Sequence, residues 1–190
     1  MNRASPALAL TAVLLLGACN KSTDSAITSA PPSASAEPPA LLVPEMSADA
    51  SAWLNGPPSP LTAARGNVIL VDAWERSCAP CIASVPAVLA LKSRFSARGL
   101  RVVSVTAFDD APGERALVAQ SAREAQMTYP CFLDKGSVWQ HAVGTSGMIP
   151  MFLIVDRSGR LTFSGKGLLV QGTPAFDRLA EAIERALGSS

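Results

Sequence analysis

The most informative stretch of the chain reads Ile69-Leu70-Val71-Asp72-Ala73-Trp74-Glu75-Arg76-Ser77-Cys78-Ala79-Pro80-Cys81. Its aliphatic and β-branched start, which includes Val68, is typical of a β-strand that is covered on both faces. Over residues 79–97, apolar residues recur mostly at spacings of three and four, which predicts a helix. Pro80 fits the first turn of this helix, where a missing N–H costs nothing, and Pro86 is expected to kink it. The two cysteines of the stretch therefore lie at a strand-to-helix junction.

The thiols of Cys78 and Cys81 are expected to face the same end of one helical turn, close enough to form a disulfide. Unsatisfied N–H groups and the helix dipole favour negative charge at a helix N-terminus, which promotes an attacking thiolate on Cys78. Cys81, one turn further on, is the natural resolving thiol that breaks a mixed disulfide. The same spacing also suits half of a zinc site. Only His141 and Cys131 would be available as further ligands, so zinc is the weaker interpretation and no metal is expected.

Downstream of this helix, the pattern alternates between strands and helices. Strands are predicted at 102–105, 129–133 and 151–155, and helices at 114–127 and 137–143. A predicted turn at 157–160 leads into a hairpin strand at 161–163, and a closing helix follows from its N-cap, Thr173, to Leu187. This order predicts an α/β fold of three layers around a central mixed β-sheet, parallel at first and antiparallel at its end.

The N-terminal part of the chain is predicted to be a targeting signal followed by a tether. Residues 1–18 combine a positive charge with an apolar run that is too short to span a bilayer as a permanent helix. The run ends in Leu16-Gly17-Ala18-Cys19, which resembles the lipobox of bacterial lipoproteins. Cys19 is therefore the expected site of lipidation, although an ordinary secretion signal cleaved just before it is the alternative. Residues 19–45 are rich in Ser, Thr, Ala and Pro and are predicted to be disordered, so the folded domain is expected to span 46–190.

The composition narrows the classes of function. The formal net charge is +1 and the sequence has no basic tract, so nothing in its charge indicates binding to a nucleic acid. With Cys19 set aside, Cys78, Cys81 and Cys131 are too few to staple an exported domain together. The cysteine pair is therefore expected to do chemistry, and Cys131 is interpreted as a buried core thiol. No cofactor is required, because the electrons of a thiol–disulfide reaction reside on the two sulfurs.

The quoted stretch resembles the active-site strand and turn of thioredoxins. Downstream, Ile149-Pro150 followed by Met151-Phe152-Leu153-Ile154-Val155-Asp156-Arg157-Ser158-Gly159 is similar to the cis-proline, strand and turn of the TlpA-like disulfide reductases that bacteria export. A further set of residues looks closer still to the DipZ-like branch of that group: Trp53-Leu54-Asn55, Ser77, Trp139 and Gly165-Lys166-Gly167. The resemblance covers about residues 52–170, and the combination of motif, spacing and order is far more specific than the cysteine pair alone.

This resemblance implies a thioredoxin-like fold and catalysis by Cys78 and Cys81. Asp72 stands where thioredoxins carry a buried carboxylate that exchanges a proton with the resolving cysteine. Burial under the motif would raise the pKa of this carboxyl group and suit it as the base for Cys81.

The resemblance also implies a substrate-docking surface around the cysteines. Pro150 would be cis and, with Ile149, would present backbone to an incoming peptide or protein. The turn residues Ala79 and Pro80 would belong to the same surface. Trp74 would pack beside the dithiol, and plain core packing is an equally good interpretation of this side chain.

Some residues depart from the family pattern. Ser77 occupies the position of the tryptophan that usually precedes the first cysteine, and Ser84 the position of a glutamate found in many TlpA-like proteins. Glu75 and Arg76 place charges beside the motif where small neutral residues are commoner. The redox potential, the proton path and the choice of partner depend on such neighbours.

These observations together predict a membrane-tethered, exported thiol–disulfide oxidoreductase, and the resemblance to the TlpA-like reductases implies that it acts as a reductase. Its expected partners are protein substrates with disulfides or dithiols and a membrane electron donor. Its expected location is the bacterial cell envelope, facing the periplasm and held by the lipid on Cys19. Asn20 is compatible with sorting to the outer membrane, because it is not the aspartate that typically retains lipoproteins at the inner membrane.

Two other classes of protein remain as alternatives. A copper-delivery protein of this fold would bind Cu(I) through Cys78 and Cys81, with Met148 or Met151 near the proline loop as a further ligand. The second alternative is a non-catalytic binding module, which would retain the fold without the redox activity. Retention of both cysteines, of Asp72 and of the proline loop argues against the binding module.

Overall fold

The structure, a computed structural model, describes residues 42–188. All of the described residues belong to the second of two units of the chain, Glu37–Ser190. The predicted signal segment, Cys19 and most of the predicted tether therefore lie outside the described part. Within residues 42–188, no helix is long and apolar enough to cross a membrane.

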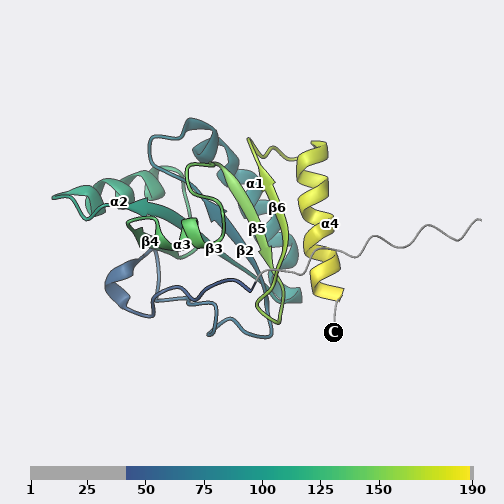
Figure 1. Cartoon of the computed structure of the whole chain (residues 1–190). Coiled ribbons are helices and arrows are strands. Elements are labelled where there is room, and N and C mark those ends of the chain that lie inside the picture. The colour runs from purple at the N-terminus through teal and green to yellow at the C-terminus, as the bar shows by residue number, and fades with distance from the viewer. Residues whose placement is uncertain (1–41, 189–190) are drawn as a thin grey trace, which may run out of the picture. The chain divides into compact units, whose positions relative to one another are not determined.

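The second unit is built on one mixed sheet with the strand order β1-β4-β3-β2-β5-β6. Its strands are β1 (Trp53–Leu54), β2 (Val68–Ala73), β3 (Leu100–Phe108), β4 (Cys131–Lys135), β5 (Met151–Val155) and β6 (Leu161–Lys166). β2, β3 and β4 run parallel to one another, whereas β5, β6 and β1 pair antiparallel with their neighbours (Figure 1). The predicted α/β fold with a mixed central sheet is confirmed.

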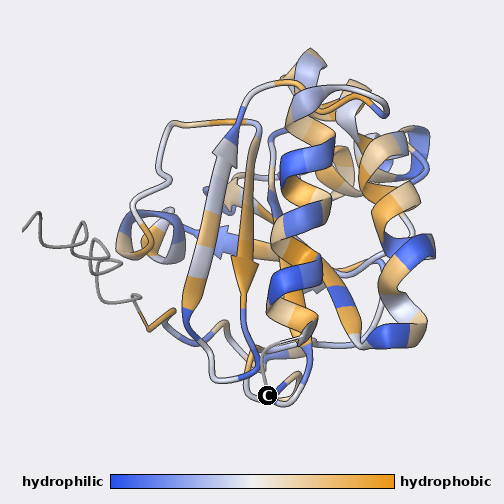
Figure 2. Ribbon diagram, turned by 90° about the vertical axis from the view of Figure 1, so that its right-hand side faces the viewer, coloured by the Kyte–Doolittle hydropathy of each residue, from blue (hydrophilic) through white to orange (hydrophobic). Residues whose placement is uncertain are grey.

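Helices cover both faces of this sheet. They are α1 (Ala79–Phe95), α2 (Glu114–Glu124), α3 (Val138–Ala142) and α4 (Pro174–Gly188). α1, α2 and α4 share one hydrophobic core with alternate strand residues such as Val68 and Leu70. α3 and the N-terminal segment around Trp53 share a second core with Ile69 and Val71. Figure 2 shows strands of hydrophobic and of mixed character beside helices that carry both hydrophilic and hydrophobic residues.

β2 is the strand on which the two cores meet. All six of its residues are buried, and successive side chains point to opposite faces of the sheet. Its even-numbered residues therefore face α1, and its odd-numbered residues face the side of α3. This alternation places Asp72, the one charged residue of the strand, on the α1 side.

Several predicted boundaries shift because strand pairing, rather than local pattern, sets them. β3 begins at Leu100 and runs to Phe108, since its pairing with β4 extends to the pair Phe108↔Lys135. β4 begins at Cys131 rather than at 129, and the two-residue strand β1 was not predicted. α2 ends at Glu124, before Gln126, whose positive φ of 58° interrupts the helix. Pro86 lies inside α1, as expected.

The folded part also extends ahead of residue 46, the predicted first residue of the folded domain. The Val43 N–H donates to the Gly159 carbonyl, and Leu42 forms an isolated bridge with Arg160. The Trp139 indole N–H donates to the Pro44 carbonyl at 2.8 Å. Main-chain contacts with the β5–β6 turn thus hold residues that the low-complexity composition assigned to the tether.

Candidate active site

Cys78 and Cys81 are joined as a disulfide at the first turn of α1, with their Cα atoms 5.2 Å apart. Cys78 is the N-cap residue, and its sulfur accepts a hydrogen bond from the Cys81 N–H at 3.2 Å. Cys81 is 1% exposed, whereas Cys78 is only partly buried and is followed by exposed Ala79 and Pro80. The two cysteines are therefore unequal: Cys78 is partly exposed, and Cys81 is buried in the protein interior.

The proline loop lies at the same edge of the sheet as the disulfide. The Ile149–Pro150 peptide bond is cis. β5 pairs with β2 up to Ala73↔Met151, so Pro150 stands level with Trp74, the residue that follows β2. The Pro150 carbonyl accepts a hydrogen bond from the Gly167 N–H at 2.9 Å, which ties this loop to the one after β6.

Asp72 is buried near the C-terminal end of β2, on the side of the sheet that faces α1. Its exposed fraction is 1%, and its Oδ2 accepts a hydrogen bond from the Tyr129 hydroxyl at 2.8 Å. Burial raises the pKa of Asp72 to about 7, because loss of solvent outweighs the opposing effect of the Tyr129 hydrogen bond. An aspartate with this pKa can both accept and release a proton near neutral pH.

Trp74 and Cys131 lie in the same buried region. Trp74 is 0% exposed and packs in one core with Cys81 and Cys131. This burial supports the core-packing interpretation of Trp74. Cys131 is a free, buried cysteine, and burial raises the pKa of its thiol to about 11. It pairs across the sheet with Ser104, which in turn pairs with Asp72.

Ser84 has a connecting role that the sequence did not reveal. Its hydroxyl donates to the Pro80 carbonyl at 2.8 Å and accepts from the Leu169 N–H at 2.9 Å. The side chain is buried and joins the first turn of α1 to the loop after β6. Tyr129 was also missed as the partner of Asp72, because the two residues are 57 positions apart and no local pattern links them.

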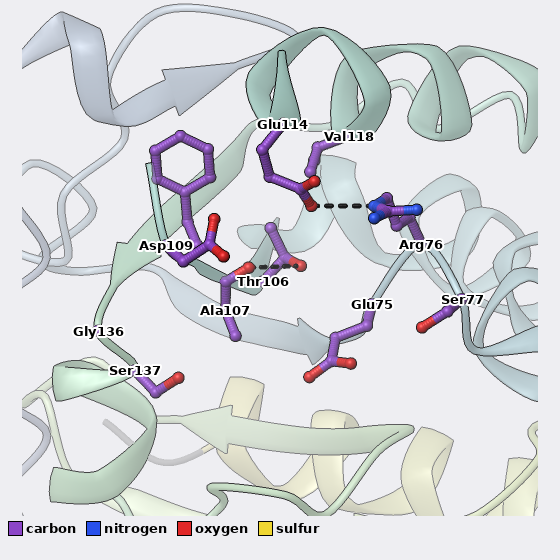
Figure 3. Close-up of a pocket in the computed structure, with 11 residues that line it drawn as sticks. Glu75, Arg76, Ser77, Thr106, Ala107, Asp109, Glu114, Val118, Gly136 and Ser137 are labelled. Carbon is purple, nitrogen blue, oxygen red and sulfur yellow. Dashed lines mark hydrogen bonds and ion pairs between the residues drawn. The ribbon is translucent and has the colours of Figure 1, made fainter. Parts of the chain in front are cut away.

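A cavity of about 280 Å³ opens beside the disulfide turn (Figure 3). Residues 75–77, the end of β3, the start of α2 and the loop before α3 line it. The Arg76 guanidinium bridges the cavity to Glu114, with Nε and Oε1 2.9 Å apart. Glu75 and Asp109 also line this cavity. Both Glu75 and Arg76 line the cavity, and Arg76 forms an ion pair with Glu114 of α2.

The further residues considered as copper or zinc ligands differ in their surroundings. Met148 is 40% exposed next to the proline loop, whereas Met151 is buried in the core on the α3 side. His141 is exposed on α3, where its Nδ1 lies 2.7 Å from the Ser137 carbonyl oxygen. Among residues 42–188, no group of three or more His, Cys, Asp or Glu side chains is arranged to hold a metal ion.

Comparison with known proteins agrees with this geometry. Residues 42–181 match the Redoxin family. The chain belongs to the Redoxin family. In an alignment of 89 residues that covers 43% of this chain, it is 36% identical to the protein DipZ of Mycobacterium bovis and to that of Mycobacterium tuberculosis. The match covers 12% of either DipZ chain, so these relatives are much longer proteins.

Solved structures confirm a thioredoxin-like fold. A thioredoxin-like superfamily protein matches 80% of this Redoxin and 99% of its own chain, at 19% identity and a TM-score of 0.67. A thiol-disulfide isomerase from Corynebacterium glutamicum matches 78% and 98%, at 17% identity and a TM-score of 0.62. A thiol:disulfide interchange protein from Chlorobium tepidum matches 80% and 100%, at 18% identity and a TM-score of 0.60. Family membership and the disulfide together support thiol–disulfide oxidoreductase chemistry.

The substitution Asp72→Asn is expected to reduce the pH dependence of stability in the disulfide form. The folded-state pKa of about 7 lies above the ordinary value of 3.8, so between these values the folded protein holds a proton that the unfolded chain has lost. The stabilisation is complete below pH 3.8 and is lost as the pH rises through 7. Between pH 5 and pH 8, the wild type should lose about 2–3 kcal/mol of unfolding free energy that Asp72→Asn keeps. Chemical denaturation at both pH values measures this difference, and equal losses in the two proteins would contradict it.

Proposed function

We propose that this Redoxin is an exported, membrane-tethered thiol–disulfide oxidoreductase that reduces disulfides in protein substrates. The observation that carries the proposal is the Cys78–Cys81 disulfide, with one accessible and one buried sulfur at a helix N-terminus. Such an arrangement separates the two steps of disulfide exchange. The accessible sulfur meets the substrate, and the buried sulfur reacts only with its neighbour.

The reduced protein would act through a mixed disulfide. The Cys78 thiolate, stabilised at the N-cap of α1, attacks one substrate sulfur, and the other substrate sulfur leaves as a thiolate. The Cys81 thiol then gives its proton to the Asp72 carboxylate and attacks the Cys78 sulfur. The Cys78–substrate bond breaks, the Cys78–Cys81 disulfide forms, and two electrons have passed to the substrate. A membrane donor would then return two electrons to the disulfide.

The surface around Cys78 suits an extended protein segment. Exposed Ala79 and Pro80 border the disulfide on one side, and partly buried Ile149 belongs to the cis-proline loop on the other. The exposed Leu168 belongs to the loop that hydrogen bonds join to Ser84 of α1 and to the proline loop. Apolar, uncharged residues at these positions favour a protein chain as substrate over a small charged disulfide. The interchange and isomerase names of the solved neighbours point to the same class of reaction.

The reductase direction is testable by equilibrium titration of the Cys78–Cys81 couple. The full chain, carrying Cys19→Ser so that the counted thiols are those of the folded domain, would be equilibrated with dithiothreitol or glutathione buffers under chelation of copper. A midpoint near that of thioredoxin, about −270 mV, is expected for a reductase. A midpoint near about −120 mV would identify an oxidant and contradict the proposed direction. Absence of a reversible two-electron couple would contradict the oxidoreductase itself.

The roles of the two sulfurs are separated by single substitutions. Cys81→Ser is expected to stop the reaction at the mixed disulfide, because no resolving thiol remains. Mixed with a disulfide-bonded protein such as insulin, this variant should accumulate a covalent adduct that dithiothreitol releases, detected by non-reducing electrophoresis and mass spectrometry. Cys78→Ser is the matched control and should form no adduct. Trapping by Cys78→Ser instead would reverse the assigned roles.

The proposed tether and location rest on residues 1–45 of the sequence, most of which lie outside the described part. Lipid on Cys19 would hold the domain in the outer membrane of a bacterial envelope, facing the periplasm. Cys19→Ser should therefore shift the expressed full chain from the membrane fraction to the soluble fraction. Asn20→Asp should leave it membrane-bound but move it to the inner-membrane band of a density gradient. A wild-type chain that is recovered in the soluble fraction would rule the anchor out.

A further inference from the structure

Tyr129 holds one oxygen of the buried carboxyl group from outside the cysteine motif. It lies two residues before β4, is 0% exposed, and donates its hydroxyl hydrogen to Asp72 Oδ2 at 2.8 Å. The segment that carries Tyr129 is anchored, because the Pro130 carbonyl accepts the Ser104 N–H at 2.8 Å. The hydroxyl is therefore fixed relative to β2 by the sheet itself.

The two oxygens of Asp72 are left in different situations. Oδ2 is engaged by Tyr129, whereas Oδ1 is buried and has no hydrogen-bond partner within residues 42–188. The titratable groups that interact with the carboxyl group are Tyr129 and Cys131 of β4, and the cysteine pair of α1 packs in the same core as these two residues. β3 contributes the neutral Ser104, β5 contributes the apolar Phe152, and no ion pair reaches Asp72 in the described residues.

We propose that Tyr129 is a positioning residue for proton transfer: its hydroxyl fixes Asp72 Oδ2 and leaves Oδ1 as the oxygen that takes the proton of the Cys81 thiol. This inference rests on the proposed function and deepens it. In the disulfide form, Cys78 and Cys81 have no S–H group that could donate to Asp72. Oδ1 accordingly has no hydrogen-bond partner in the described residues. The same Tyr129 hydrogen bond serves both protonation states, since Oδ2 remains an acceptor when Oδ1 is protonated.

The chemical consequence lies in the second step of exchange. As the Cys81 sulfur attacks the Cys78 sulfur, the S–H proton moves to Oδ1, the new disulfide forms, and the outgoing thiolate carries away the electron pair. A hydroxyl donor stabilises the ionised carboxylate more than the neutral acid. Loss of this donor should therefore raise the pKa of Asp72 further above its value of about 7, and fewer molecules would hold the base at neutral pH.

The experiment isolates this step by stopped-flow mixing of the reduced full chain, in the Cys19→Ser background, with the chromogenic disulfide dithiobis(nitrobenzoate). Attack by Cys78 releases the first nitrothiolate in a phase that depends on reagent concentration. Attack by Cys81 releases the second in a phase that does not. The rate of the second phase is measured from pH 5 to pH 9 for the wild type, Tyr129→Phe, Asp72→Asn and the double variant.

In the wild type, the second phase is expected to accelerate as the pH rises through about 7. In Tyr129→Phe, this rise should move up by about one pH unit, which slows the phase about fivefold at pH 7. In Asp72→Asn, the rise should be absent, and adding Tyr129→Phe should change nothing further, because Tyr129 acts through Asp72. Thr106→Val, which removes another buried hydroxyl on the strand beside Asp72, is the matched control and should keep the wild-type profile.

Carbon-13 NMR of the disulfide form can monitor the titration of the Asp72 carboxyl group directly, without kinetics. The pH midpoint of this titration should be higher in Tyr129→Phe than in the wild type. An unchanged midpoint and an unchanged profile in this variant, with a normal two-phase wild type, would overturn the Tyr129 assignment alone. A wild type that releases no second equivalent would overturn both this assignment and the proposed function. An equal loss of rate at every pH would show a structural role and would also overturn the assignment.

Discussion

The burial of β2 on both faces is the constraint on which the rest of the molecule depends. The strand runs between parallel β3 and antiparallel β5, and its six residues contribute to the two hydrophobic cores in alternation. The disulfide lies shortly after the C-terminal end of this strand, at the edge of the sheet where α1 begins. The same alternation carries Asp72 into the core on the α1 side. One buried strand thereby sets both the position of the disulfide at the end of the sheet and the desolvation of the Asp72 carboxyl group.

The disulfide site is tuned by neutral groups and by burial. A carboxyl group paired with a lysine or arginine has a lowered pKa and is a weak base at neutral pH. Asp72 instead has the Tyr129 hydroxyl as its partner, and desolvation dominates the outcome. With a pKa of about 7, both forms are populated at neutral pH. In the proposed mechanism, the carboxylate would take the Cys81 proton during reduction of a substrate, and the acid would return that proton in the reverse reaction.

The sequence predicted those features whose signal is local. β2, α1 and β5 show unbroken apolar runs or helical periodicity, and the cysteine spacing at the head of a helix predicted the disulfide. Features that depend on pairing between distant segments were not predictable in this way. β1 is two residues long and exists only through its contact with β4, and the ends of β3 follow its neighbours. The Tyr129–Asp72 hydrogen bond joins residues whose local patterns are those of an ordinary aromatic core residue and a strand-end acid.

The departures from the family pattern become intelligible from their contacts. In many of the TlpA-like proteins that the sequence resembles, a glutamate occupies the position of Ser84. Here the buried serine bridges the Pro80 carbonyl and the Leu169 N–H, so it joins the active-site turn to the loop that flanks the docking surface. A serine hydroxyl does not titrate near neutral pH, so this position supplies rigidity and no base. The proposed proton exchange with Cys81 is therefore assigned to Asp72, whose Oδ1 has no hydrogen-bond partner and whose Oδ2 accepts from Tyr129 in the described residues.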